Sequence, residues 1–119
     1  MENTIIQNKT FEFAIRVVNL YRYLCEERKE YVLSKQLLRS GTSIGANVRE
    51  AKRGQTRADF GMKMSIALKE AEESLYWIEL LEATGFLSGS QSDSIKADCE
   101  GIVKMLVATT KRVYGDTSQ

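Results

Sequence analysis

The feature that most constrains the fold is the stretch from Ser34 to Gly85, where apolar residues recur every three or four positions in two successive segments. This spacing places apolar side chains on one face of an α-helix. Between the segments, Gly54 is a typical residue just past a helix C-terminus, and Thr56 with Asp59 matches a capping box that begins the next helix. Because few residues separate the two helices, we expect them to fold back as an antiparallel hairpin.

Similar periodicity on both sides of this hairpin predicts two more helices, and the chain has no proline to interrupt them. The four expected helices span residues 9–27, 34–53, 57–84 and 91–114. Ser34 is the expected cap of the second helix, and Ser90 with Asp93 offers a capping box for the fourth. Residues 1–8 are expected to fray, and residues 115–119 to form a polar tail. The 119 residues therefore fit one all-α domain, an antiparallel up-down-up-down four-helix bundle.

The first and third expected helices are apolar around more of their circumference than a small bundle can bury. The first carries two neighbouring stripes, Phe11–Ala14–Val18–Tyr21–Cys25 and Phe13–Val17–Leu20–Leu24. The apolar arc of the third exceeds roughly 200°, whereas a surface helix needs a little over 100°. Deep burial at the centre of the bundle is one explanation, but a chain of this length has little polypeptide with which to bury such an arc. We therefore expect one flank of the third helix to contact another subunit. This flank holds Met62, Ile66, Trp77 and Leu80.

Polar residues interrupt the facing sides of the second and third helices. They are Gln36, Ser43, Asn47, Glu50, Glu70 and Glu73. Folding the hairpin about Gln55 places Ser40 opposite Glu70 and Gln36 opposite Glu73, where buried carboxylates need hydrogen bonds. We interpret the strip as a satisfied polar network that fixes the register of the two helices. A carboxylate metal site is the alternative, but the di-iron bundles use Glu-x-x-His pairs and this chain has no histidine.

Composition argues against most other classes of protein. With no histidine, no glycine-rich phosphate loop and no nucleophile beside a base, we expect no catalytic residue, metal or cofactor. Cys25 and Cys99 fall at apolar helical positions and are expected to be small buried core residues rather than a disulfide. The N-terminus does not resemble a signal peptide, and no apolar run approaches the length of about 18 residues that spans a membrane. A cytoplasmic protein is expected.

Charge is spread unevenly although the net charge is only +1. Residues 34–63 hold seven basic and two acidic residues, a net +5, whereas residues 64–100 hold two basic and eight acidic residues, a net −6. The candidate phosphate-binding residues are Lys35, Arg39, Arg49, Lys52, Arg53 and Arg57. Four of them share the outward face of the second helix, with the small residues Thr42 and Ala46 between them. Such a stripe can follow phosphates, but it holds no aromatic residue that reads bases. The alternative is a solvated face that pairs with the acidic third helix of a neighbouring subunit.

The segments LSKQLLRSGTSIGANVREA and ADFGMKMSIALKEAEESLYWIELL resemble the bacterial 23S rRNA intervening-sequence protein family, also called the four-helix-bundle protein family. The residues that carry the resemblance are Ser34, Gln36, Leu37, Ser43, Ile44, Asn47, Glu50, Phe60, Ala67, Glu70, Glu73 and Trp77. The resemblance implies an antiparallel four-helix bundle that assembles as a ring-shaped homopentamer. A related branch, the accessory variability determinant of diversity-generating retroelements, is a basic pentameric barrel that binds nucleic acid and a reverse transcriptase. The net charge of +1 departs from that basic branch.

Two functions therefore remain as hypotheses. The first is a non-enzymatic oligomeric scaffold that associates with RNA or DNA through the basic face of the second helix. The second is a ring-shaped adaptor that binds an unknown protein partner and has no affinity for nucleic acid.

Overall fold

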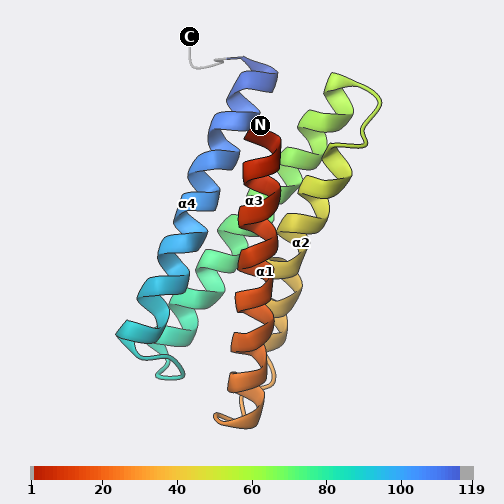
Figure 1. Ribbon diagram of the computed structural model, residues 1–119. Coiled ribbons are helices and arrows are strands. Elements are labelled where there is room, and N and C mark those ends of the chain that lie inside the picture. The colour runs from red at the N-terminus through yellow and green to blue at the C-terminus, as the bar shows by residue number, and fades with distance from the viewer. Residues whose placement is uncertain (1, 116–119) are drawn as a thin grey trace.

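The computed structural model describes residues 2–115, which form four α-helices and no β-strand. The helices are α1 (Glu2–Glu26), α2 (Leu33–Ala51), α3 (Arg57–Ala83) and α4 (Gly89–Tyr114). Each helix packs against its neighbours in sequence, and α1 also contacts α4. Both ends of the described chain lie at the same end of the bundle as the α2–α3 connection (Figure 1). This arrangement confirms the predicted four-helix bundle with short connections.

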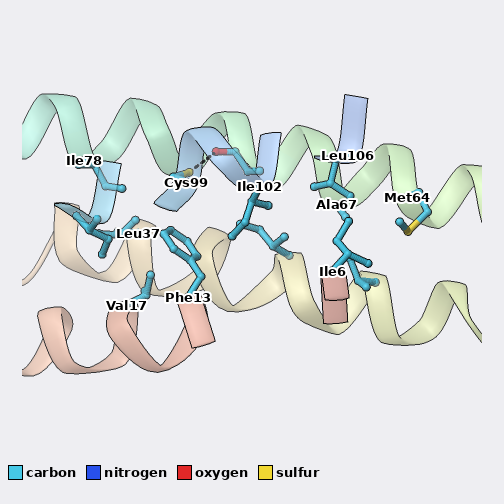
Figure 2. Packing of buried hydrophobic residues seen from close by; sticks show 14 of the residues in the cluster. Ile6, Phe13, Val17, Leu37, Met64, Ala67, Ile78, Cys99, Ile102 and Leu106 are labelled. Atoms are coloured by element: carbon cyan, nitrogen blue, oxygen red, sulfur yellow. Dashed lines mark hydrogen bonds between the residues drawn. The ribbon is translucent and has the colours of Figure 1, made fainter. Parts of the chain in front are cut away.

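The core consists of one buried stripe from each helix, as the apolar spacing predicts (Figure 2). The stripes are Phe13, Val17 and Leu24 on α1; Leu37, Ile44 and Val48 on α2; Met64, Ala67, Ala71, Ile78 and Leu81 on α3; and Ile95, Cys99, Ile102 and Leu106 on α4. Gly41 lets α2 approach α1 closely, because a Cβ atom there would lie 2.8 Å from a methyl group of Val17. The second of the two predicted α1 stripes therefore faces the core. Phe11, in the other stripe, remains 55% exposed.

The N-terminal part of α1 differs from the prediction. The helix begins at Glu2 rather than at residue 9, so residues 2–8, which were expected to fray, are helical. Ile6 and Thr10 extend the buried stripe by two turns, at 3% and 0% exposure. The Thr10 hydroxyl donates a hydrogen bond to the carbonyl oxygen of Ile6 at 2.8 Å, so this polar side chain is satisfied inside the core. Polar neighbours obscured the apolar spacing of this segment in the sequence.

The N-terminus of α2 is capped by Glu30 and not, as predicted, by Ser34. The Glu30 carboxylate accepts hydrogen bonds from the backbone N–H groups of Val32, Leu33 and Ser34, at 3.0, 2.9 and 2.7 Å. Ser34 instead lies within the first turn, buried, and its hydroxyl donates to the Glu30 carbonyl oxygen. Burial raises the pKa of Glu30, but the three backbone N–H groups outweigh it and hold the pKa below its usual value.

The connection between α2 and α3 keeps one of its two predicted signals. Thr56 caps α3, as predicted, because its hydroxyl accepts the N–H of Asp59 at 3.0 Å. The second bond of the predicted capping box, from the Thr56 N–H to the Asp59 carboxylate, does not occur among the described residues. Gly54 does not have the positive φ expected after a helix. Its lack of a side chain matters for another reason, because a Cβ atom there would lie 3.1 Å from that of Asp59 and 3.2 Å from the backbone nitrogen of Phe60.

The connection between α3 and α4 begins as predicted and ends two residues earlier than predicted. Gly85 has a φ of 86° and ends α3, and the N–H of Phe86 returns to the carbonyl oxygen of Leu81 at 2.9 Å. Leu87, at 2% exposure, turns back onto the core. The capping box of α4 is Ser88 with Gln91 rather than Ser90 with Asp93. Residues 116–119 of the predicted polar tail lie outside the described residues.

Two further expectations concern cysteine burial and membrane insertion. Cys99 is fully buried and its thiol donates to the carbonyl oxygen of Ala71, whereas Cys25 is partly exposed, so the predicted burial holds for one of the two cysteines. Cys25 lies where α1 reaches the end of the bundle and covers less core. Across residues 2–115, no helix has the length and apolar character needed to cross a membrane.

Candidate nucleic-acid interface

The six candidate phosphate-binding residues are all exposed; five of them form two groups along α2 and its C-terminal end, and Arg57 is the first residue of α3. Lys35 and Arg39 lie in the N-terminal half of α2, and Arg49, Lys52 and Arg53 lie at or just past its C-terminus. Ten residues separate Arg39 from Arg49, so the groups stand about 15 Å apart along the helix axis. The C-terminal group adds cations where the helix dipole favours them.

Three of the six basic side chains are held by hydrogen bonds or an ion pair within the chain. Arg57 donates to the carbonyl oxygens of Val113 and Arg112, at 3.2 and 2.7 Å, and so caps the C-terminus of α4. Lys52 donates to Gln7 Oε1 at 3.2 Å. The third, Arg39, lies 3.6 Å from a carboxylate oxygen of Glu73 on α3. These contacts make Arg57 the least suited of the six to bind a phosphate.

An open groove of about 480 Å³ runs between α1 and α2 beside the C-terminal basic group. It is lined by Gln7, Phe11, Ala14, Thr42, Gly45, Ala46, Arg49, Glu50 and Arg53. Phe11 is 55% exposed, and the Arg49 guanidinium lies 5.8 Å from the centre of its ring, a cation–π contact. The small residues at positions 42, 45 and 46 leave the floor of the groove open.

Phe11 is the residue of this surface that reasoning from the basic stripe missed. It lies on a different helix from the arginines, 38 positions before Arg49. The available signal was the excess apolar arc of the first helix, because one of its two stripes had to remain outside the core. The tertiary pairing of α1 with α2 therefore supplies the aromatic group that the basic stripe itself does not contain.

The polar strip between α2 and α3 does not form one connected network. Ser74 donates to Ser40 at 2.9 Å, so the two helices pair one turn further along α3 than the predicted pairing of Ser40 with Glu70. Asn47 donates to the Ser43 carbonyl oxygen of its own helix at 2.9 Å. The residues of the predicted network therefore form fewer hydrogen bonds with one another than a connected network between the two helices requires.

The acidic members of the strip pair with other residues. Glu50 forms an ion pair of 2.8 Å with Lys63 of α3. Glu73 accepts the indole N–H of Trp77 at 3.0 Å and lies 3.6 Å from Arg39. Glu70 Oε1 is buried and has no hydrogen-bond partner within the described chain. Gln36 takes no part in the hydrogen bonds that join these carboxylates to their partners.

The predicted subunit-contact flank lies on the side of α3 that turns away from the core. Met62 is 54% exposed, and Ile66, Trp77 and Leu80 are partly exposed. Tyr76, at 56% exposure, meets Trp77 edge to face with ring centres 5.0 Å apart. These side chains form an apolar surface that α1, α2 and α4 leave partly uncovered.

The described residues contain no group of three or more His, Cys, Asp or Glu side chains arranged to hold a metal ion. Fold and surface together define a small all-α bundle protein, with a basic groove between α1 and α2 and an apolar flank on α3. The profile of the 23S rRNA-intervening sequence protein family matches residues 2–108, and the chain belongs to this family, as its resemblance predicted.

The chain is also similar to a protein of known structure. This is a protein of unknown function from the S23 ribosomal protein family of Bacteroides thetaiotaomicron, and it has 52% sequence identity to this chain. The match covers 93% of this chain and 99% of the other, with a TM-score of 0.91. A comparison with curated proteins finds no match.

Proposed function

We propose that the protein is a non-enzymatic oligomeric scaffold that binds RNA or DNA through the basic face of α2. The observation that carries this proposal is the grouping of Arg49, Lys52 and Arg53 along the exposed groove between α1 and α2. Three cations within the last turn and its end can neutralise successive phosphates, and the release of counterions then drives binding. The name of the family, which refers to an intervening sequence of 23S rRNA, is consistent with a nucleic-acid partner.

The local electrostatics support phosphate binding. Glu50 lines the same groove, but its carboxylate is 2.8 Å from the ammonium of Lys63, so its negative charge is compensated. Arg49 contacts the face of an aromatic ring and not a carboxylate. The guanidinium groups at the groove can therefore bind an external anion without first breaking a strong internal ion pair.

Self-association, as the homopentamer that the family resemblance implies, is part of the same proposal. The partly exposed flank of Met62, Ile66, Trp77 and Leu80 offers an apolar contact surface on α3, a different helix from the two that line the basic groove. The buried and unpartnered oxygen of Glu70 lies on the same side of that helix. A ring would repeat the basic face in every subunit, and multivalent binding would then raise a weak contact by orders of magnitude.

The test is the binding of a labelled RNA hairpin and a labelled duplex DNA across a series of salt concentrations. Wild-type affinity is expected to fall steeply as the salt concentration rises. The double variant Arg49→Glu with Arg53→Glu is expected to bind more weakly, and its slope of log affinity against log salt should be flatter by about 2. A matched control reverses two exposed charges on α4, Lys104→Glu with Lys111→Glu, and is expected to retain most of the affinity. Equal losses in both variants would reject the basic face as the binding surface.

A second candidate function is supported by the exposed apolar flank of α3. An adaptor ring would use the part of this surface that lies outside the subunit-contact flank, with Tyr76 at 56% exposure, to bind a protein partner. This function predicts no affinity for either nucleic acid near physiological salt. It also predicts that Tyr76→Glu abolishes the binding of a specific co-purifying protein while native mass shows the assembly unchanged.

A further inference from the structure

The groove between α1 and α2 combines three features that a basic surface alone does not require. Phe11 presents a ring that is 55% exposed. The floor beside the ring is made of Thr42, Gly45 and Ala46, whose small side chains leave an open volume of about 480 Å³. This volume lies within the range of about 300–1,000 Å³ that is usual for small-molecule sites. The space is therefore large enough for a planar aromatic group beside the ring.

We propose that this groove binds one unpaired nucleobase of a single-stranded nucleic acid, stacked on Phe11, with Arg49 and Arg53 at the adjoining phosphates. The proposal rests on the proposed function and adds the form of nucleic acid that is bound. Aromatic side chains in a basic groove are the general means by which proteins hold single strands, because every base presents a flat face.

The arrangement of the charges matches a nucleotide better than an isolated ring. The Arg49 guanidinium lies over the Phe11 ring, 5.8 Å from its centre, so a base that stacks on this face displaces the guanidinium toward the adjoining phosphate. Arg53 follows one helical turn later on the same wall. Gln7 lines the groove as well and brings Lys52 to it through a 3.2 Å hydrogen bond. The groove thus combines an aromatic ring from α1 with three cations that lie within about one turn of each other at the end of α2.

Double-stranded nucleic acid fits this groove less well. In a duplex the bases are paired and stacked on one another, so their faces are not accessible to Phe11 and the duplex can contact only the cations around it. Single strands, loops and ends expose base faces and can use both the ring and the cations. A preference for unpaired nucleotides therefore follows from the exposed ring.

A second copy of the chain is a less suitable occupant. Packing two such grooves against each other would bring Arg49 and Arg53 close to their own counterparts, and like charges repel, so a second copy would have to present a different face, as in a head-to-tail ring. The groove also lies between α1 and α2, whereas the expected subunit-contact flank lies on α3. Charge complementarity thus favours a polyanion over a groove-to-groove dimer at this site.

The experiment compares Phe11→Ala with wild type on three probes: a labelled 12-nucleotide single strand, a blunt duplex of the same sequence, and the same strand carrying abasic sites. If a base stacks on Phe11, the Phe11→Ala variant is expected to bind the unmodified single strand with an affinity about fivefold to 150-fold lower than wild type. Affinity for the duplex and the abasic strand is expected to be unchanged, and so is the salt slope, because no charge is removed. Phe11→Trp is expected to retain single-strand affinity.

Two further variants separate the groove from general effects. Tyr31→Ala removes an aromatic ring of similar exposure, 56%, that lies outside the groove, and it is expected to bind like wild type. Ala46→Leu adds a larger side chain to the floor and is expected to lower single-strand affinity while the arginines remain.

The outcomes distinguish the two proposals. If wild type binds both nucleic acids and Phe11→Ala weakens neither, or weakens both equally, the base site is refuted and the basic face stands. A Phe11→Ala variant with a changed native mass would place the ring between copies and also refute the base site. If wild type binds no probe, the proposed function fails and the base site fails with it. If a free mononucleotide binds as tightly as the single strand, and affinity does not change with strand length, the ligand of the groove is a mononucleotide and the inference is overturned.

Discussion

Replacing Glu30 by alanine tests whether one side chain fixes the start of α2. The carboxylate accepts three backbone N–H groups, at 3.0, 2.9 and 2.7 Å, and is 8% exposed. In the Glu30→Ala variant water can replace the acceptor at Val32, which is 71% exposed, but not at Ser34, which is fully buried. A buried N–H without a partner costs about 1–3 kcal/mol, and loss of a helix cap costs about 1 kcal/mol. We therefore expect a loss of roughly 3 kcal/mol in the free energy of unfolding.

The same contacts define the pH dependence of this stabilisation. Because the pKa of Glu30 is lowered in the folded protein, the stabilisation is fully present above the unfolded value of about 4.3 and is lost as the pH falls through the folded pKa. The difference in stability between wild type and Glu30→Ala is therefore expected to be constant from pH 7 to pH 5. It should shrink progressively below about pH 4.

Chemical unfolding followed by circular dichroism, repeated from pH 3 to pH 7, measures both effects. Thermal unfolding should show a decrease of roughly 10 °C in Tm for Glu30→Ala at pH 7. The matched control is Glu26→Ala, which removes an exposed carboxylate from the end of α1 and is expected to change stability by less than about 0.5 kcal/mol. Equal stability of the two variants, or a difference that persists unchanged at pH 3, would refute the capping role.

Two other predictions concern the core. Gly41→Ala places a Cβ atom 2.8 Å from Val17 and is expected to lower stability by about 1–2 kcal/mol despite the gain in helix propensity, whereas Gly101→Ala, with no atom within 4 Å, should raise it by up to about 1 kcal/mol. Urea unfolding checks both, and equal effects would contradict the close approach of α1 and α2. Burial raises the pKa of the Cys99 thiol to about 12, and nearby carboxylates add to the rise. A thiol reagent at pH 8 should therefore label Cys25 in the native protein and reach Cys99 only after unfolding, and native labelling of Cys99 would contradict its burial.

The helices and their buried stripes could be predicted because they depend on local spacing. Leu37, Ile44 and Val48 recur at spacings of seven and four positions, and only one face of α2 can carry them inward. Ile6 was missed, because the polar residues around it hide the same period. Periodicity therefore found the core wherever the opposite face was clearly polar, and it failed where the pattern was diluted.

Helix ends were harder to predict because several residues compete to cap each one. Ser34 has the right chemistry for a cap, but the helix begins one residue before it, and Glu30 accepts the N–H groups of Val32, Leu33 and Ser34 with a full negative charge. Likewise, Ser88 and Ser90 are both plausible caps, and the choice depends on where Gly85 ends the preceding helix. Sequence alone does not rank these competitors.

Contacts between helices required the structure. The pairing of Ser40 with Ser74 lies one turn from the predicted pairing with Glu70, because the α2–α3 connection determines the register. A shift of one turn moved Glu70 away from its expected partner. The meeting of Phe11 with Arg49 likewise depends on how α1 and α2 pack, and no local pattern encodes it.

The most direct test of the central claim measures the affinity of wild type and of Arg49→Glu with Arg53→Glu for one labelled single strand between 50 and about 200 mM salt. If Arg49, Lys52 and Arg53 each contact a phosphate, the plot of log affinity against log salt should have a slope of about −2 for wild type and about −0.7 for the variant, which keeps only Lys52. Parallel slopes for the two proteins, or no binding by wild type near physiological salt, would contradict a phosphate-binding role for the basic face of α2.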